Sequence, residues 1–144
     1  MMTVEYRPIR PEEVPDLLNL WSQGSDAYRA YQTARFASDP AACDHTYVAI
    51  LPNGTIVSTI HYLVSLRWNA TGQLCLVGEI DSVGTQPDAR RQGHAQRLLL
   101  LVLAALEREG CDWSMLNATE MGRPLYERHG WRYFPEPWRR GTVV

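Results

Sequence analysis

The sequence VGTQPDARRQGHAQRLLLLVLAALEREG, from Val83 to Gly110, joins a strand-like segment to a long apolar, helix-like segment. Between them lie two adjacent arginines and a glycine, in a chain whose formal net charge is −2. A helix that begins here leaves its first backbone amides without carbonyl partners, at the positive end of the helix dipole. We therefore expect an anion site, in which Gly93 lets a phosphate approach the backbone and Arg90 and Arg91 add charge. A tight turn with solvated arginines explains this stretch equally well.

Hydrophobic periodicity and turn residues predict the elements on both sides of this segment. Alternation of β-branched residues indicates strands, and Asn53-Gly54 supplies the positive backbone angles of a tight hairpin turn. The helix over 92–109 is apolar nearly all round, so we expect it to be covered on most sides. The order predicts an α/β fold of the α+β type with a mixed sheet, built from helices at 10–21, 22–37, 92–109 and 122–130, strands at 4–9, 46–50, 56–68, 73–85, 112–118 and 131–134, and a short strand within 139–144.

Composition indicates one globular domain over residues 1–144, of which 45% are apolar and 21% charged. The longest apolar run has nine residues, whereas a membrane span needs about 20. The first residues lack the basic and apolar pattern of an export signal, so we expect a cytoplasmic protein with no membrane partner. Cys43, Cys75 and Cys111 are odd in number and form no close pair, which argues against a disulfide framework or a zinc site.

The charged residues are distributed unevenly along the chain. Residues 1–87 hold five arginines and nine acids, and residues 88–144 hold nine arginines and seven acids. The C-terminal part is therefore the better host for an anionic ligand. Its excess of two positive charges is too small for a nucleic-acid surface, so we expect no nucleic-acid partner.

Two segments resemble motifs of a known family. The sequence contains neither the dinucleotide fingerprint G-x-G-x-x-G nor the P-loop G-x-x-x-x-G-K-[ST]. Instead, Arg90-Arg91-Gln92-Gly93-His94-Ala95, preceded by SVGTQP, resembles motif A, [QR]-x-x-G-x-[GA], of the GNAT N-acetyltransferases. GRPLYERHGWRY, over residues 122–133, resembles their later motif A-x-x-L-Y-x-x-x-G-F, with Trp131 in place of phenylalanine. The resemblance implies the GNAT fold, a mixed central sheet of about six or seven strands flanked by about four helices and splayed at its two central strands.

The resemblance also implies that acetyl-CoA is the acyl donor and that no metal takes part. The backbone amides of residues 91–96 would cradle the pyrophosphate, and the pantetheine arm would run along the strand end at Val83 and Thr85. Thr119 stands where many members carry an asparagine, and its hydroxyl would contact the cofactor. The His94 side chain is expected at the surface. The expected cofactor-binding residues are Val83, Thr85, Arg90, Arg91, Gln92, Gly93, His94, Ala95, Gln96 and Thr119.

Transfer of an acetyl group to an amine requires a base for the ammonium and an acid for the departing thiolate. Alternation along the strand puts Glu79 and Asp81 on one side, together with Val83 and Thr85. Glu79 also lies eleven residues before motif A, the offset at which histone-acetylating members carry a glutamate base. We expect Glu79 to be the base, directly or through a water, with Asp81 as the alternative. Tyr126 occupies the position of the family's tyrosine, whose hydroxyl protonates the thiolate.

The motifs favour an N-acetyltransferase that acts on a primary amine of a small molecule or peptide. A non-catalytic GNAT-fold module that binds an acyl-CoA, as a sensor or interaction partner, would carry the same motif A, but Tyr126 favours catalysis. The lack of a P-loop lysine and of a metal-binding carboxylate cluster argues against a phosphotransferase. Candidate acceptor contacts are Tyr28, Tyr31, His61 and Tyr62, with PEPWRR near the C-terminus. The sequence does not identify the amine, and it leaves monomer and homodimer open.

Overall fold

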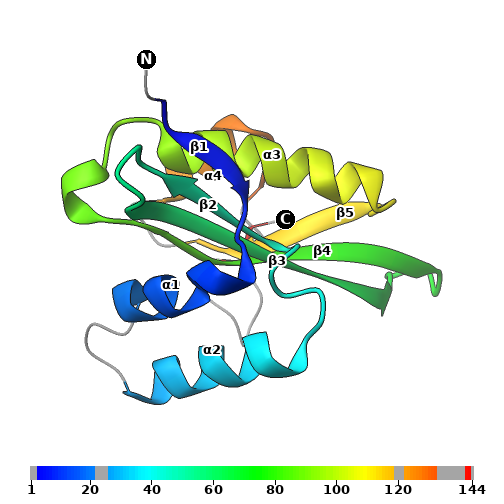
Figure 1. Ribbon diagram of the computed structural model, residues 1–144. Helices are drawn as coiled ribbons and strands as arrows, with labels where there is room; N and C mark the ends of the chain where they lie inside the picture. The colour runs from blue at the N-terminus through cyan, green and yellow to red at the C-terminus, as the bar shows by residue number, and fades with distance from the viewer. Residues whose placement is uncertain (1–2, 22–25, 119–121, 133–141, 144) are drawn as a thin grey trace. The chain divides into compact units, whose positions relative to one another are not determined.

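The computed structural model describes residues 3–21, 26–118, 122–132 and 142–143 (Figure 1). The order of its elements is the one predicted from the sequence, with small shifts at their ends. The elements are β1 (Glu5–Pro8), the 3-10 helix η1 (Pro11–Glu13), α1 (Val14–Trp21), α2 (Asp26–Ser38), β2 (Thr46–Ile50), β3 (Ile56–Trp68), β4 (Leu74–Thr85), the 3-10 helix η2 (Pro87–Ala89), α3 (His94–Arg108), β5 (Trp113–Asn117), α4 (Arg123–Arg128) and β6 (Thr142–Val143).

The strand predicted at 131–134 is wrong at Trp131 and Arg132, which lie in no strand, and residues 133–134 lie outside the described residues. The backbone amide of Trp131 donates to the carbonyl of Tyr126 at 3.2 Å and so completes the end of α4. An amide that satisfies a helix end is not available to a strand ladder. The short strand predicted within 139–144 is confirmed by β6.

The sheet is mixed, as predicted. Hydrogen bonds join the strands in the order β1-β2-β3-β4-β5-β6, which makes six strands in the described part of the chain. The pairs β1–β2 and β5–β6 are antiparallel, whereas β4 and β5 are parallel. The parallel register runs from Val77↔Trp113 to Ile80↔Leu116, while β4 continues to Thr85. Within the described residues, this register does not reach the C-terminal part of β4.

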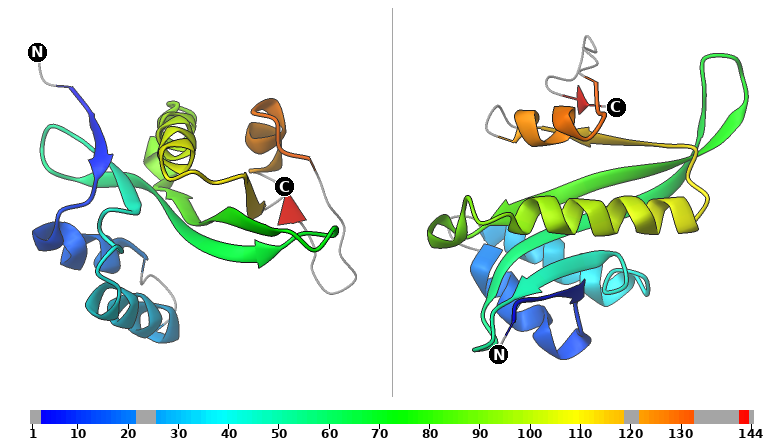
Figure 2. Two further views of the ribbon diagram at one scale, coloured as in Figure 1. Left: turned by 90° about the vertical axis from the view of Figure 1, so that its right-hand side faces the viewer. Right: turned by 90° about the horizontal axis from the view of Figure 1, so that it is seen from above.

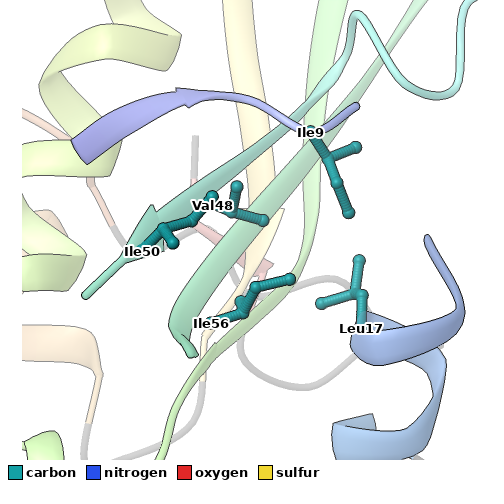
Figure 3. Packing of buried hydrophobic residues seen from close by; sticks show 5 residues of the cluster. All are labelled: Ile9, Leu17, Val48, Ile50 and Ile56. Atoms are coloured by element: carbon teal, nitrogen blue, oxygen red, sulfur yellow. The ribbon is translucent and has the colours of Figure 1, made fainter. Parts of the chain in front are cut away.

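The chain forms two compact units, and the first comprises Met1–Ile60 and Gly84–Leu98. In this unit α1 and α2 lie side by side, as Figure 1 and the left view of Figure 2 both show. Leu17 of α1 points toward Ile56 of β3 (Figure 3). The buried core around them also contains Ile9, Val48 and Ile50. Burial of each of these side chains stabilises the unit by about 1.5–3 kcal/mol.

An ion pair fixes the entry to α1. Arg7 Nη1 and Nη2 donate to the two carboxylate oxygens of Glu13 at 2.8 and 2.9 Å. The backbone amide of Arg10 donates to Glu13 Oε1 at 2.8 Å, as in a capping box. The hydrogen bond from Arg7 lowers the pKa of the Glu13 carboxyl, because it stabilises the charged form.

The second unit comprises His61–Val83 and Leu99–Val144. Gly78 of β4 lies so close to α3 that an added Cβ would stand 2.5 Å from Leu106 Cδ2. Glycine at position 78 therefore permits this close approach of strand and helix. The apolar stripe of α3 includes Leu99, Val102 and Leu106, which are buried.

The expectation that α3 is covered on most sides is wrong. Leu100 is 47% exposed, and Ala104 is also exposed. The buried residues instead follow the spacing of a single helical face, which is the usual pattern of a helix that packs against one side of a sheet. Among the described residues, no helix is long and apolar enough to cross a membrane.

Candidate functional site

The segment between β4 and α3 is an exposed loop with two left-handed residues, and it belongs to the first unit. Arg90 is extended, with φ −68° and ψ 158°. Arg91 has φ 63° and Gly93 has φ 83°. Successive backbone amides in a turn that contains left-handed residues can form a concavity that binds an anion. Residues 90–93 are all exposed.

The start of α3 supplies further amides. The amide of Arg97 donates to the carbonyl of Gly93 at 3.1 Å. The amides of His94, Ala95 and Gln96 therefore precede the first helical hydrogen bond of α3, and none of them donates to a backbone carbonyl within the described residues. An added Cβ at Gly93 would meet no atom within 4 Å, so the space beside this backbone is open. Open space, unpaired amides and two arginines suit a pyrophosphate group.

The expectation that His94 lies at the surface is wrong, because its side chain is only 5% exposed. His94 Nδ1 and the hydroxyl of Tyr6 in β1 are hydrogen-bonded at 2.8 Å. The guanidinium of Arg97 lies 5.2 Å from the centre of the Tyr6 ring. The first residue of α3 is thus tied to β1. No local sequence pattern indicates this contact, because the two residues are 88 positions apart.

Thr85 and its neighbours connect the loop to β3. The hydroxyls of Thr85 and Ser58 are 2.8 Å apart, and Ser58 Oγ donates to the carbonyl of Gly84 at 3.0 Å. Arg90 Nε donates to the carbonyl of Thr85 at 3.4 Å. The side-chain hydroxyl of Thr85 is therefore held by β3, which leaves its backbone as the group that the predicted pantetheine contact would use.

A left-handed residue interrupts β4 just before its C-terminal end. Ser82 has φ 52°, a backbone conformation rare outside glycine and typical of a bulge in a strand. A bulge breaks the regular alternation of side chains. The predicted shared side of Glu79 and Asp81 with Val83 and Thr85 is therefore not supported across Ser82. Val83, which follows the bulge, is 37% exposed.

Glu79 lies in the second unit, where it is half-buried and paired with Arg67 of β3. Arg67 Nη2 donates to Glu79 Oε2 at 3.1 Å. Sequence reasoning missed Arg67, although the hairpin turn contains a signal. The amide of Asn69 donates to the carbonyl of Gln73, and counting back along both strands puts the odd-numbered residues on one face. Asp81, the alternative base, is half-buried in the same strand.

Tyr126 lies in α4 of the second unit and is 5% exposed. Its ring meets the Trp131 ring edge to face, with the ring centres 6.1 Å apart and the planes at 70°. Trp131 is also buried, as expected for the core position that it takes in the motif. Burial raises the pKa of the Tyr126 hydroxyl above its ordinary value, because the phenolate is poorly solvated. The phenol is therefore protonated at neutral pH.

The candidate acceptor contacts differ in exposure. Tyr28 and Tyr31 of α2 are 36% and 59% exposed. His61 and Tyr62 of β3 are 0% and 3% exposed, so their side chains belong to the core of the second unit in this structure. Thr119 and the PEPWRR segment lie outside the described residues.

Comparison with known protein families decides what the two motifs mean. A family model described as an acetyltransferase (GNAT) domain matches residues 5–134. The chain belongs to the GNAT family. The match includes both the motif A loop and the α4 segment with Tyr126. A comparison with the sequences of curated proteins gives no match.

Solved structures share the GNAT fold over nearly the whole chain. An acetyltransferase from Trypanosoma brucei is 22% identical, with a TM-score of 0.75, over 96% of this chain and 99% of that one. A predicted acetyltransferase from Clostridium acetobutylicum, solved with acetyl-CoA, is 18% identical, with a TM-score of 0.75, over 96% and 95%. Glucosamine-6-phosphate N-acetyltransferase from Arabidopsis thaliana is 15% identical, with a TM-score of 0.69, over 96% and 97%. At these identities the similarity shows the fold.

Proposed function

We propose that this GNAT protein is an acetyl-CoA-dependent N-acetyltransferase that moves an acetyl group directly to a primary amine of a small molecule or peptide. The observation that carries the proposal is the loop at Gly93, which combines left-handed backbone, open space and unpaired amides. Family membership supports acetyl transfer as the reaction. The similar structure from C. acetobutylicum contains acetyl-CoA, and the one from A. thaliana is an N-acetyltransferase, which supports the cofactor and the acceptor class.

Acetyl-CoA supplies a thioester, whose carbonyl carbon an amine can attack. The loop residues would hold the pyrophosphate through the amides of residues 91–96, with Arg90 and Arg91 as additional positive charge. The backbone at Val83 and Thr85 would contact the pantetheine arm. We propose these residues as the cofactor site, and we propose that the hydroxyl of Thr119 also contacts the cofactor.

We propose Glu79 as the general base, acting directly or through a water. The hydrogen bond from Arg67 reaches only Oε2, so Oε1 is the oxygen that would accept a proton from the amine or from the water. Asp81, in the same strand, is the alternative. Deprotonation of the acceptor is required because an ammonium has no lone pair with which to attack.

We propose Tyr126 as the general acid that protonates the departing thiolate. Its raised pKa keeps the phenol protonated at neutral pH, so the proton is available. The same shift makes the phenol a weaker acid than an ordinary tyrosine. Its proton would therefore move to the sulfur as negative charge builds up there, not before.

A non-catalytic acyl-CoA-binding module is the second candidate, and the Arg67–Glu79 ion pair favours it. A carboxylate held by a guanidinium has a structural role that needs no catalysis. In this alternative the cofactor loop would be retained, and neither Glu79 nor Tyr126 would affect any turnover.

Release of free thiol from acetyl-CoA, followed over a panel of primary amines, distinguishes the two candidates. The panel would include amino sugars, polyamines, amino acids and peptide N-termini, with a reaction lacking amine as the blank. The enzyme proposal predicts amine-dependent thiol release that is reduced in Glu79→Gln. Saturable acetyl-CoA binding without amine-dependent release from any class of amine would favour the binding module. Absence of acetyl-CoA binding would contradict both candidates.

A further inference from the structure

The first unit contains a small cavity beneath α1, which we call the α1 pocket. It has a volume of about 110 Å³ and is lined by Leu17 and Leu20 of α1, by residues 56–59 of β3 and by residues 84–86 at the end of β4. Leu17 and residues 56–59 are buried, whereas Leu20 and residues 84–86 are half-buried. The β3 side therefore forms the floor, and the cavity meets solvent at the side of Leu20 and residues 84–86.

The size of the α1 pocket limits what can enter it. An apolar cavity of about 150 Å³ accommodates a benzene molecule. By this scale, the α1 pocket takes a group of about four or five non-hydrogen atoms. A short branched alkyl chain has this size, whereas a sugar ring or an aromatic side chain is too large.

The lining residues with polar side chains are Ser58, Thr59, Thr85 and Gln86, and the hydroxyls of Ser58 and Thr85 lie in hydrogen-bond contact with each other. The carbonyl of Gly84 can only accept, so the single Ser58 proton is used in the 3.0 Å bond to it. In the 2.8 Å contact between the two hydroxyls, Thr85 must then be the donor. With its proton used in this way, Thr85 Oγ1 keeps lone pairs but has no proton to give. The hydroxyl pair thus offers a ligand an acceptor.

The α1 pocket contains no ionisable side chain among its lining residues. Transfer of an ammonium or carboxylate into such surroundings costs far more than the transfer of a neutral group, because no opposite charge compensates for lost hydration. A carboxylate would in addition bring no proton for the Thr85 oxygen. A neutral hydroxyl on a short alkyl chain matches the size of the cavity, its lack of ionisable side chains and the acceptor at Thr85 Oγ1.

We propose that the α1 pocket is a binding site for a short, uncharged aliphatic alcohol, either free or as the end of a larger ligand. The alkyl part would contact Leu17, Leu20 and Ile56, and the hydroxyl would donate to Thr85 Oγ1. This inference does not rest on acetyl transfer, because it uses only the lining of the cavity. Its test is therefore independent of the thiol-release experiment.

Methyl NMR of the full chain, titrated with isobutanol, tests the proposal. We expect saturable shifts of the Leu17, Leu20, Ile56 and Val57 methyl signals, with millimolar affinity. Methyl isopropyl ether has the same size but no donor, and it should bind about fivefold more weakly through loss of one hydrogen bond. Isobutyrate and isobutylammonium should not shift these signals. Equal affinity for ether and alcohol, tighter binding of either ion, or no saturable shift with isobutanol would overturn the proposal.

Two substitutions locate the binding. Thr85→Val keeps the shape of the side chain and removes the acceptor, so the preference for isobutanol over the ether should disappear. Thr33→Val, on the exposed face of α2, is the matched control and should keep that preference. Leu20→Phe fills the open side of the α1 pocket and should abolish shifts by both probes while the methyl spectrum stays dispersed. Unchanged preference in Thr85→Val, or unchanged binding in Leu20→Phe, would contradict the assigned site.

Discussion

Two parts of the proposed site differ in what defines their roles. One is the cofactor loop at residues 90–93 of the first unit, and the other comprises Glu79 and Tyr126 of the second unit. In the loop, the backbone conformation defines the role, since Arg91 and Gly93 are left-handed and the next three amides have no backbone partner in the part of the chain that the structure describes. In the second unit, single side chains define the roles, and each of them also contacts another residue. Glu79 accepts a hydrogen bond from Arg67, and the ring of Tyr126 packs against that of Trp131. A site formed by backbone amides requires only the residues that permit its backbone conformation. The function of a side chain also depends on the residues packed around it.

The largest effect should come from Gly93→Glu, which adds bulk and negative charge where the pyrophosphate is proposed to bind. Acetyl-CoA affinity measured by calorimetry should fall by at least about 100-fold, because the site is both filled and repelled electrostatically. Gly93→Ala is the matched control, since it carries the same strain at φ 83° with little bulk. A similar loss in both variants would attribute the effect to backbone strain, and unchanged affinity in Gly93→Glu would remove the loop from the cofactor site.

Glu79→Gln should lower turnover at neutral pH by about 100-fold, the lower end of the range for a general base. Acetyl-CoA affinity should change little, because the substituted side chain is not among the proposed cofactor contacts. Asp81→Asn is the comparison variant. If Asp81→Asn shows the loss and Glu79→Gln does not, the role of base passes to Asp81.

Tyr126→Phe should lower turnover by tenfold or more, about 1.4 kcal/mol in the barrier. The ring and its contact with Trp131 are kept, so melting temperature and acetyl-CoA affinity should stay near those of the wild type. Tyr47→Phe, at another buried tyrosine, controls for the removal of a hydroxyl from the interior. Wild-type turnover in Tyr126→Phe, with the chemical step rate-limiting, would leave water as the proton donor.

The predictions that succeeded from sequence are those that depend on local patterns. Asn53-Gly54 marks the turn between β2 and β3, although the expected positive φ occurs only at Gly54, at 88°, and not at Asn53. The residues around Gly93 indicated the start of α3, where the space beside the backbone is open. The misses depend on contacts that these local patterns do not reveal, one of them distant in the chain and one nearby. His94 is buried because it contacts Tyr6, and Trp131 continues no strand because its amide completes α4.

The parts of the site that could not be predicted are likewise tertiary. Arg67 and Glu79 are 12 positions apart, and the turn at Asn69 and Gln73 indicates only that they share a face of the sheet, not that they pair. Serine seldom has a positive φ, so its presence at position 82 does not indicate a left-handed residue. The alternation of side chains along β4 therefore could not predict this interruption of the strand. The α1 pocket arises where two strands and a helix meet, and no single segment encodes it.

A smaller effect is expected from Glu13→Gln, which disrupts the Arg7 pair in the first unit without altering the loop. The folded-state pKa of Glu13 is lowered, so the pair stabilises the fold above the ordinary pKa of the carboxyl and loses this contribution as the pH falls through the lowered value. Glu13→Gln should therefore reduce the free energy of unfolding by at most about 1 kcal/mol at neutral pH, since the pair is partly exposed. Urea denaturation should show this difference shrinking in acid. A difference that grows in acid would have the wrong sign.

Arg90→Ala should have the smallest effect, a loss of about two- to threefold in acetyl-CoA affinity, because an exposed charge contributes little beside several backbone amides. Arg108→Ala, at the C-terminal end of α3, is the matched control for loss of one exposed arginine. A loss as large as that in Gly93→Glu would mean that arginine side chains, and not the backbone, form the anion site.

Amide NMR during titration with acetyl-CoA tests the central claim most directly, because it observes the backbone groups proposed to hold the pyrophosphate. The account predicts saturable shifts that are largest for the amides of Gly93, His94, Ala95 and Gln96, with coenzyme A giving nearly the same shifts and pantetheine, which lacks the pyrophosphate, failing to give them. Saturable binding of acetyl-CoA that leaves these four amide signals unmoved would contradict it.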